Sequence, residues 1–302
     1  MHSATRTGAR LLGAAGVAGA TALGYALWEG QSYRLRQVHV PVTREGSRLA
    51  AGRTATLLHL SDLHLTPWTS RRARWIRELA ALEPDVVVAT GDLLGHVDAM
   101  PLLQEALAPL LERPGAFVFG SNDYYVPTMK NPLRYFMEHD MPTEHRGELP
   151  TQELRDLLTG AGWLDLNNAQ GHLESNGLIF AFKGTDDPHI GVDDYASVAG
   201  PYPEADARIG VTHAPYARVL GEMSADHPDL MLAGHTHGGQ VCVPGYGALV
   251  TNCDLPASQA SGLSGFDGVP LHVSAGLGTS MFTPIRVACP PEATVIRLGV
   301  AG

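Results

Sequence analysis

The chain has few of the features that mark disulfide-rich, disordered or nucleic-acid-binding proteins. It contains only three cysteines, Cys242, Cys253 and Cys289, and their odd number without CxxC spacing excludes a disulfide framework and a CxxC zinc site. Charged residues make up only 17 % of the chain against 44 % apolar residues, which excludes native disorder and a coiled coil. Basic residues are outnumbered 21 to 31 by acidic ones, so the net charge of -10 disfavours binding to nucleic-acid polymers.

Residues 1–30 differ in composition from the rest of the chain. Residues 11–28 carry no charge, and at about 1.5 Å per residue they just span a hydrocarbon core of about 30 Å. Tyr25 and Trp28 suit a membrane interface. We expect residues 1–30 to form a membrane anchor helix. A cleaved signal segment, for which residues 20–22 (ATA) have the small-x-small form, and a buried helix stay open as alternatives.

Residues 31–302 are predicted to form one α/β domain. Strand-like runs alternate with amphipathic helices in the order β-α-β-α-β, which favours a sheet with a parallel core and ligands beyond the carboxyl ends of its strands. We expect residues 124–160 to form an active-site loop or small cap, with a helix over residues 151–159. The strands are expected at residues 33–42 (an edge strand), 54–60, 85–90, 116–119, 178–183, 208–212, 229–233, 271–274 and 293–298, and the first two helices at 70–82, capped by Ser70, and 102–111.

Metal-binding side chains recur where these strands end. They are Asp62, His64, Asp92, Asn122, His213, His235 and His237. Singly, each has an ordinary structural interpretation, such as a polar loop histidine or a helix N-cap. However, the ends of adjacent parallel strands lie about 5 Å apart, so we expect the seven side chains to converge. Without bound cations, such a gathering of polar and like-charged groups would be energetically costly.

The predicted cluster has the composition of a two-metal site. Three ligands for each ion and one shared carboxylate can hold two divalent ions about 3.5 to 4 Å apart. Such a pair lowers the pKa of a shared water and stabilises the attacking and leaving oxygens of a displacement at phosphorus. Mixed nitrogen and oxygen ligands without thiolate favour manganese, iron or zinc over calcium.

The motifs Asp62-Leu63-His64 and Gly91-Asp92, residues 120–123, Thr212-His213 and residues 234–240 (GHTHGGQ) resemble the ordered signature of the calcineurin-like metallophosphoesterases. The last motif resembles that of a bacterial membrane-associated branch. This resemblance covers most of the chain after residue 54, and it implies a four-layer α/β/β/α sandwich of two facing mixed sheets, preceded here by the membrane helix.

The resemblance also implies roles for the side chains. It implies a binuclear metal-dependent phosphoester hydrolase in which a hydroxide that bridges the two metals is the nucleophile. Asp62, His64 and His237 would hold the first ion, and Asp92 would bridge the two ions. The second ion would be held by an asparagine together with His213 and His235.

Residues 120–123 depart from the family pattern, because they read Gly-Ser-Asn-Asp where the family has Gly-Asn-His-Asp or Gly-Asn-His-Glu. We favour a one-residue slip that makes the Asn122 amide a ligand, because the neutral hydroxyl of Ser121 is a weak one. The missing histidine assists the leaving group in the family. His96 is one candidate to replace it, and a solvent-facing histidine is the alternative. We expect Asp123 to orient the neighbouring loop or a ligand histidine.

Two further features have alternative interpretations. Arg286 either contacts a substrate phosphate with its guanidinium or forms an ion pair with Glu292. The aromatic residues Tyr124, Tyr125, Tyr135 and Phe136, with Met129 and Met137, either form an apolar wall beside the metals or pack ordinarily within the loop.

We therefore expect a metal-dependent phosphatase or phosphodiesterase that acts on a membrane- or envelope-associated phosphoester, such as a lipid-linked one. Alternatives are a soluble-nucleotide phosphodiesterase and a degenerate, non-catalytic metal-binding scaffold. We expect membrane association through residues 1–30, or export after signal cleavage. The side of the membrane, the native metals and the oligomeric state stay open.

Overall fold

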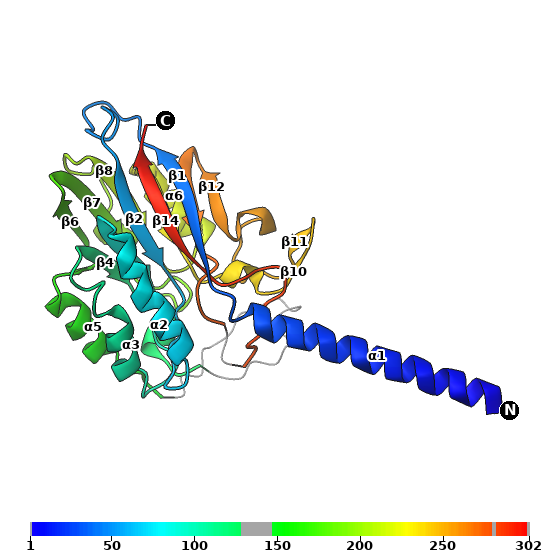
Figure 1. Ribbon diagram of the computed structural model, residues 1–302. Coiled ribbons are helices and arrows are strands. Elements are labelled where there is room, and N and C mark those ends of the chain that lie inside the picture. Colours follow the sequence, from blue (N-terminus) through cyan, green and yellow to red (C-terminus); the bar gives the residue numbers. More distant parts are fainter. Residues whose placement is uncertain (1, 128–146, 280–281, 301–302) are drawn as a thin grey trace.

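Two six-stranded mixed sheets face each other in the computed structural model, which describes residues 2–127, 147–279 and 282–300, with side chains from residue 16 onward (Figure 1). The first sheet has the order β1 (Arg34–Pro41), β14 (Glu292–Gly299), β2 (Ala55–Leu60), β3 (Val86–Thr90), β4 (Gly115–Val118) and β5 (Leu164–Asp165). The second has the order β12 (Gly262–Phe266), β13 (Val269–Val273), β9 (Leu230–Ala233), β8 (Ala207–Val211), β7 (Leu178–Gly184) and β6 (Gln170–Ser175).

Both sheets have a parallel core. β2, β3, β4 and β5 run parallel, and so do β7, β8, β9 and β13. β14 lies between β1 and β2, parallel to the first and antiparallel to the second. Antiparallel strands also lie at both edges of the second sheet. The carboxyl ends of the parallel strands in each sheet therefore meet at one edge.

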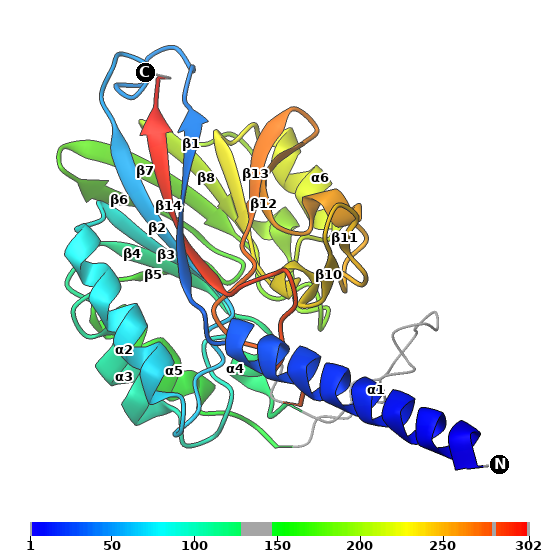
Figure 2. The ribbon, with the colours of Figure 1, turned by 45° about the vertical axis from the view of Figure 1, so that its right-hand side comes forward.

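Three apolar clusters separate four layers, as the resemblance implied (Figure 2). Val86 and Val88 of β3 pack between the two sheets, whereas Val87 and Ala89 face the helices outside the first sheet, because side chains alternate along a strand. These helices are α2 (Ser70–Glu78), α3 (Met100–Leu107) and α5 (Thr151–Gly160), and α6 (Ala217–Ala225) covers the second sheet.

The expected strands are confirmed, with ends shifted by a few residues at most. The sequence did not predict the edge strands β6 and β12, whose side chains alternate only between half-buried and exposed. Ser70 is the first residue of α2 and not its cap. The first expected helix ends earlier than predicted, because its last residues form the separate 3-10 helix η1 (Leu79–Leu82). The remaining elements that the sequence did not predict are short: β5, β10 (Cys242–Val243), β11 (Gly247–Ala248), α4 (Ser121–Tyr124), η3 (Tyr195–Ser197), η4 (His237–Gly239) and η5 (Ala257–Gln259).

The interpretation of residues 124–160 as a loop or cap can be followed only at its two ends. Residues 128–146 lie outside the described part of the chain, and with them Met129, Tyr135, Phe136 and Met137. The ring of Tyr124 packs edge-on against Phe119 with centroids 5.6 Å apart, so ordinary packing accounts for its position.

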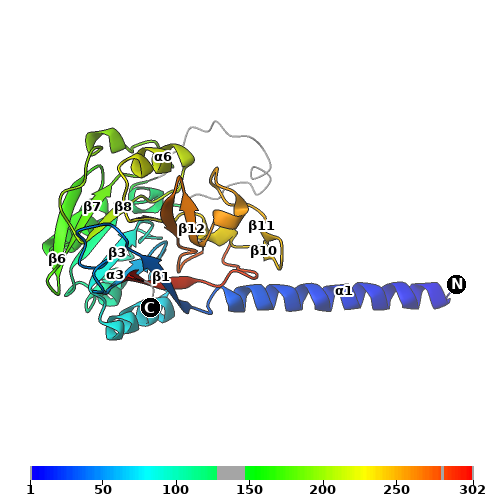
Figure 3. The ribbon, with the colours of Figure 1, turned by 90° about the horizontal axis from the view of Figure 1, so that it is seen from above.

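The N-terminal segment forms the helix α1 (His2–Glu29), which extends away from the domain in all three views (Figures 1 to 3). Its last turn contacts the domain: the Ala26 carbonyl accepts a hydrogen bond from the Arg286 backbone N–H, and the Glu29 carboxylate accepts one from Ala288. Leu23 and Trp28 are 55 % and 61 % exposed. Within the described residues, no helix combines the length and the apolar character that crossing a membrane requires.

Candidate metal centre

The loops at the carboxyl ends of both sheets meet and bring the predicted ligands together. Asp62 follows β2 and Asp92 follows β3, which are parallel neighbours in the first sheet. His213 follows β8 and His235 follows β9, which are parallel neighbours in the second sheet. The ligands thus come from two facing rows of strand ends and not, as expected from the sequence, from adjacent strands alone.

Four of the predicted ligands form a compact group. Asp62, His64, Asp92 and His237 each offer an atom within 4.8 Å of the others. The Nε2 atoms of His64 and His237 are 3.2 Å apart, and each lies near a carboxylate: His64 is 3.5 Å from Asp92 Oδ2 and His237 is 3.6 Å from Asp62 Oδ1. Two oxygen and two imidazole donors fit one divalent ion of the manganese, iron or zinc type.

Asp92 also faces a second histidine. Its Oδ1 atom lies 3.6 Å from His213 Nε2, so one carboxylate has His64 on one side and His213 on the other. The His213 Nδ1–H donates to the Thr90 carbonyl at 2.6 Å, which directs Nε2 toward Asp92. Nε2 is buried and has no hydrogen-bond partner among the described residues. His235 packs against His213 with ring centroids 5.2 Å apart, which places a further imidazole on this side of Asp92.

Burial and charge together set the protonation of the group. Burial lowers the pKa of His64 to about 4 and that of His237 well below its usual value, which keeps both imidazoles neutral and able to bind metal. Burial also raises the pKa of Asp62 to about 6. Burial would raise the pKa of Asp92 too, but His213 and His64 outweigh it and lower this pKa to about 2. His213 responds in the opposite sense: burial lowers its pKa, but Asp92 and other nearby carboxylates raise it to about 9. A bound cation would compensate the same excess of negative charge.

The backbone around the group is held in an unusual conformation. Five of the predicted ligands have a positive φ, a conformation that non-glycine residues seldom adopt and that costs of order 1 to 3 kcal/mol at each position. They are Asp62 (50°), His64 (40°), Asp92 (54°), His235 (69°) and His237 (50°). Such strain persists only where the surrounding structure imposes it, and it concentrates at functional sites.

The divergent motif at residues 120–123 supports Asp92. The Asn122 backbone N–H donates to Asp92 Oδ1 and its Nδ2 donates to Oδ2, both at 2.8 Å. Asp123 is buried and accepts hydrogen bonds from the backbone N–H groups of Asp92, Leu93, Leu94 and Gly120. This is the arrangement expected of a carboxylate that orients the loop after β3.

Arg286 and His96 do not take the positions considered from the sequence. Arg286 is fully buried and donates to the backbone carbonyls of His237, Ala275, Gly276, Gly278 and Cys289. It therefore does not present its guanidinium to a substrate, and Glu292 pairs with Arg36 in its place. His96 contacts Asp98 and the exposed Trp68, so its contacts do not support a role as the replacement for the missing histidine.

Sequence reasoning missed a further acidic loop at the centre. Asp187 and His189 follow β7, and Asp187 is fully buried. The His189 ring packs against His235 with centroids 4.5 Å apart, and its Nδ1 lies 2.9 Å from the Tyr216 hydroxyl. The rule that found the other ligands, an acid or histidine directly after a strand, also applies to Asp187.

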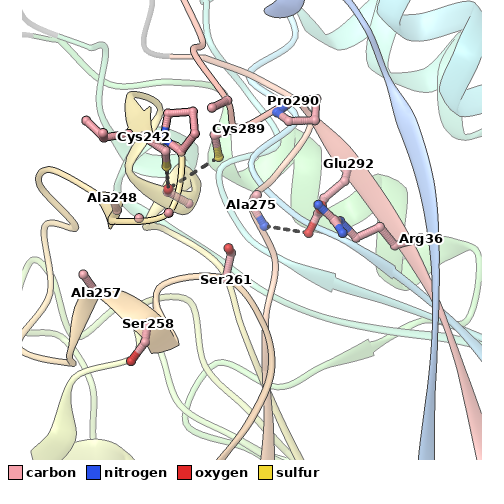
Figure 4. A pocket seen from close by; sticks show the side chains of 16 residues that line it. Arg36, Cys242, Ala248, Ala257, Ser258, Ser261, Ala275, Cys289, Pro290 and Glu292 are labelled. Atoms are coloured by element: carbon pink, nitrogen blue, oxygen red, sulfur yellow. Dashed lines mark hydrogen bonds and ion pairs between the residues drawn. The ribbon is translucent and has the colours of Figure 1, made fainter.

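A cavity of about 330 Å³ is lined in part by Gly238 of η4 and by residues of β10 and β11 (Figure 4). Its lining includes Gly238, which follows His237, but none of the seven predicted ligands. Cys242 and Cys289 also line it, and their thiols lie 3.2 and 3.4 Å from the Gly238 carbonyl oxygen. Both cysteines are free, so the sulfur atoms support the turn after His237 by hydrogen bonding.

Comparison with known proteins agrees with this geometry. A family model described as calcineurin-like phosphoesterase matches residues 55–239, which include all of the predicted metal ligands. The chain belongs to the calcineurin-like phosphoesterase family. As a member of this family it is a metal-dependent phosphoesterase, and its buried Asp and His cluster fits the divalent metal ions that the family uses.

Several curated relatives have similar lengths. The chain is 28 % identical to the uncharacterized metallophosphoesterase YkuE of Bacillus subtilis over 80 % of this chain and 78 % of the relative. It is 29 % identical to the uncharacterized metallophosphoesterase YkoQ of the same organism over 82 % and 84 % of the two chains. It is also 28 % identical to the phosphodiesterase YaeI of Escherichia coli over 80 % and 81 %.

Proposed function

We propose that this phosphoesterase hydrolyses its substrate at two divalent metal ions that share Asp92. The observation that carries the proposal is the position of this carboxylate, with Oδ2 3.5 Å from His64 Nε2 and Oδ1 3.6 Å from His213 Nε2. Asp62, His64 and His237 would hold the first ion. His213 and His235 would hold the second, together with Asn122, whose contact with Asp92 favours it over Ser121.

When bound, two such ions would supply a hydroxide near neutral pH and would neutralise charge on the phosphoryl group. The protein fixes the geometry of their ligands. Asn122 and the loop held by Asp123 position the Asp92 carboxylate, and the Thr90 carbonyl fixes the His213 ring. Burial keeps His64 in the neutral form that binds metal. No charged side chain of the protein has to act as a nucleophile.

An assay with two generic substrates tests this proposal. The 302-residue chain is loaded with manganese or zinc and incubated with mono- and bis-nitrophenyl phosphate. We expect Asp92→Asn to lower kcat/KM by at least about 100-fold, because it removes the shared negative oxygen. Asp98→Asn, at an exposed carboxylate, is the matched control and should retain wild-type activity. Equal activity of Asp92→Asn and wild type would exclude the proposal, and a wild type that binds metal without turnover would favour the scaffold alternative.

We further propose that the protein is membrane-associated through α1 and acts on a lipid-linked or other envelope phosphoester. The exposed apolar side chains of Leu23, Leu27 and Trp28 support this, as does the GHTHGGQ string at residues 234–240, which resembles that of the membrane-associated branch. A soluble nucleotide is the alternative substrate.

Two measurements test the membrane proposal. After cell fractionation, the chain is expected in the membrane pellet, and a variant that lacks residues 1–30 in the supernatant; recovery of both in the supernatant would refute membrane association. Hydrolysis of phospholipid-linked phosphoesters in vesicles is then compared with that of soluble nucleotides. A preference for nucleotides would refute the lipid-linked substrate class.

A further inference from the structure

The loop after β7 places one more carboxylate beside the second ion position. Gly184 at the end of β7 pairs with Val211 at the end of β8, and the Thr185 N–H continues this contact by donating to the Val211 carbonyl at 3.2 Å. Asp187 therefore leaves the sheet beside His213, which lies two residues beyond Val211. The row of strand ends in the second sheet thus carries Asp187, His213 and His235 in order.

Asp187 is buried in a way that its hydrogen bonds do not explain. Its side chain is inaccessible to solvent, and Oδ1 accepts a hydrogen bond from the His189 N–H at 2.8 Å. Oδ2 has no hydrogen-bond partner among the described residues. Asp187 also forms no ion pair with any of them. A buried carboxylate oxygen without a partner is costly, and native proteins seldom keep one without a bound ion or water.

One ring nitrogen of His213 is unsatisfied in the same way. Its Nε2 is also buried and has no hydrogen-bond partner in the described part of the chain, although Nδ1 is held by the Thr90 carbonyl. Asp187 follows β7 and His213 follows β8, and these two strands pair in parallel up to Gly184 and Val211. One cation between them would satisfy both atoms.

The charge of the proposed centre supports a third carboxylate. Two divalent ions bring four positive charges, whereas Asp62, Asp92 and one hydroxide bring three negative charges. Asn122 is neutral, and the imidazole ligands are neutral when they bind metal, because His213 would release its proton on binding. Because uncompensated charge is expensive in a buried site, an additional carboxylate brings the centre to neutrality.

We propose that Asp187 is an additional ligand of the second ion and binds it through Oδ2. This inference rests on the proposed function, because it requires a second ion at His213. Binding through Oδ2 is compatible with the hydrogen bond that His189 donates to Oδ1, so the carboxylate is already oriented before the ion binds.

Metal titration of the 302-residue apoprotein tests the inference. Manganese is added to wild type, Asp187→Asn and the control Asp98→Asn, and both dissociation constants are measured by calorimetry. Wild type and control are expected to bind two ions. Asp187→Asn should bind the first ion with an unchanged dissociation constant and the second with one raised by about 100-fold or more. Two ions with wild-type affinities in Asp187→Asn would overturn the inference.

A measurement on the wild type keeps the inference testable if Asp187→Asn does not fold. In crystals grown with zinc, anomalous scattering locates the ions, and Asp187 Oδ2 is expected at about 2.0 to 2.2 Å from the second one. A separation above about 3.5 Å would refute direct ligation. A wild type that binds no second ion would instead refute the proposed two-ion function, so the two failures are distinguishable.

Discussion

Arg286→Met should destabilise the fold and weaken metal binding together. The buried guanidinium joins the loop at residues 275–278, after β13, to the His237 and Cys289 carbonyls. That loop also touches the first ion position, because the Leu277 and Gly278 N–H groups donate to the Ser61 and Asp62 carbonyls. Methionine fills a similar space but donates no hydrogen bond, so the carbonyls lose their partner.

The size of the effect follows from the number of bonds. Arg286 donates to five backbone carbonyls, and a net contribution of about 1 kcal/mol each gives about 5 kcal/mol. Removing a buried charge returns part of this, so we expect the free energy of unfolding to fall by about 3 to 5 kcal/mol. Arg286→Lys should lose less, because an ammonium keeps the charge and three donors.

Urea unfolding and metal titration of wild type, Arg286→Met and Arg286→Lys measure the loss of stability and the loss of metal binding. Arg113→Met replaces a half-exposed arginine and should change the free energy of unfolding by less than about 0.5 kcal/mol. If Arg286→Met unfolds at the wild-type urea midpoint, binds metal normally and only raises KM, then Arg286 contacts substrate after all. That result would refute the positioning role derived from its burial.

Three further predictions concern packing, charge and metal. A Cβ at Gly234 would lie 1.9 Å from Ser61 Oγ, so Gly234→Ala should lower the free energy of unfolding by about 1 to 3 kcal/mol. It should also prevent binding of the first ion in a metal titration. Gly221→Ala is the control and should change neither property, because Gly221 in α6 has open space around it. For Asp206, hydrogen bonds from Arg48 and Ile179 outweigh burial and lower the pKa from 3.8 to about 2. The ionised Asp206 should therefore stabilise the folded protein by about 2 kcal/mol above about pH 4, and this contribution should be lost as the pH falls toward 2. The urea midpoints of wild type and Asp206→Asn should converge at low pH. A difference that stays constant with pH would contradict this. Removing the ions with a chelator should lower the melting temperature, because ligand at 100 times its Kd stabilises by about 2.7 kcal/mol; an unchanged melting temperature would show that no ion stabilises the fold.

The sequence predicted the central strands well because they are buried on both faces. The first four residues of β3 (VVVA) are all apolar and buried, as is typical of a strand inside a parallel sheet. Edge strands such as β6 expose every second residue, and their polar sequence resembles a loop. The layer order came from the resemblance, since strand runs alone do not say how many sheets they form.

The site was predictable where ligand type coincided with a strand end. Asp62, Asp92, His213 and His235 each follow a strand, and so does Asp187, which was not predicted. The burial of Arg286 could not be read from its sequence neighbours, because its partners lie in two other loops that only the tertiary structure brings together. Long-range contacts of this kind carry no local sequence pattern.

The metal content of the purified chain tests the central claim most directly. The 302-residue chain and Asp92→Asn are loaded with manganese or zinc, separated from free metal and measured by elemental analysis. The shared carboxylate predicts about two ions per wild-type chain and one or fewer in Asp92→Asn. A wild type that holds no metal, or an Asp92→Asn variant that still holds two ions, would contradict the account.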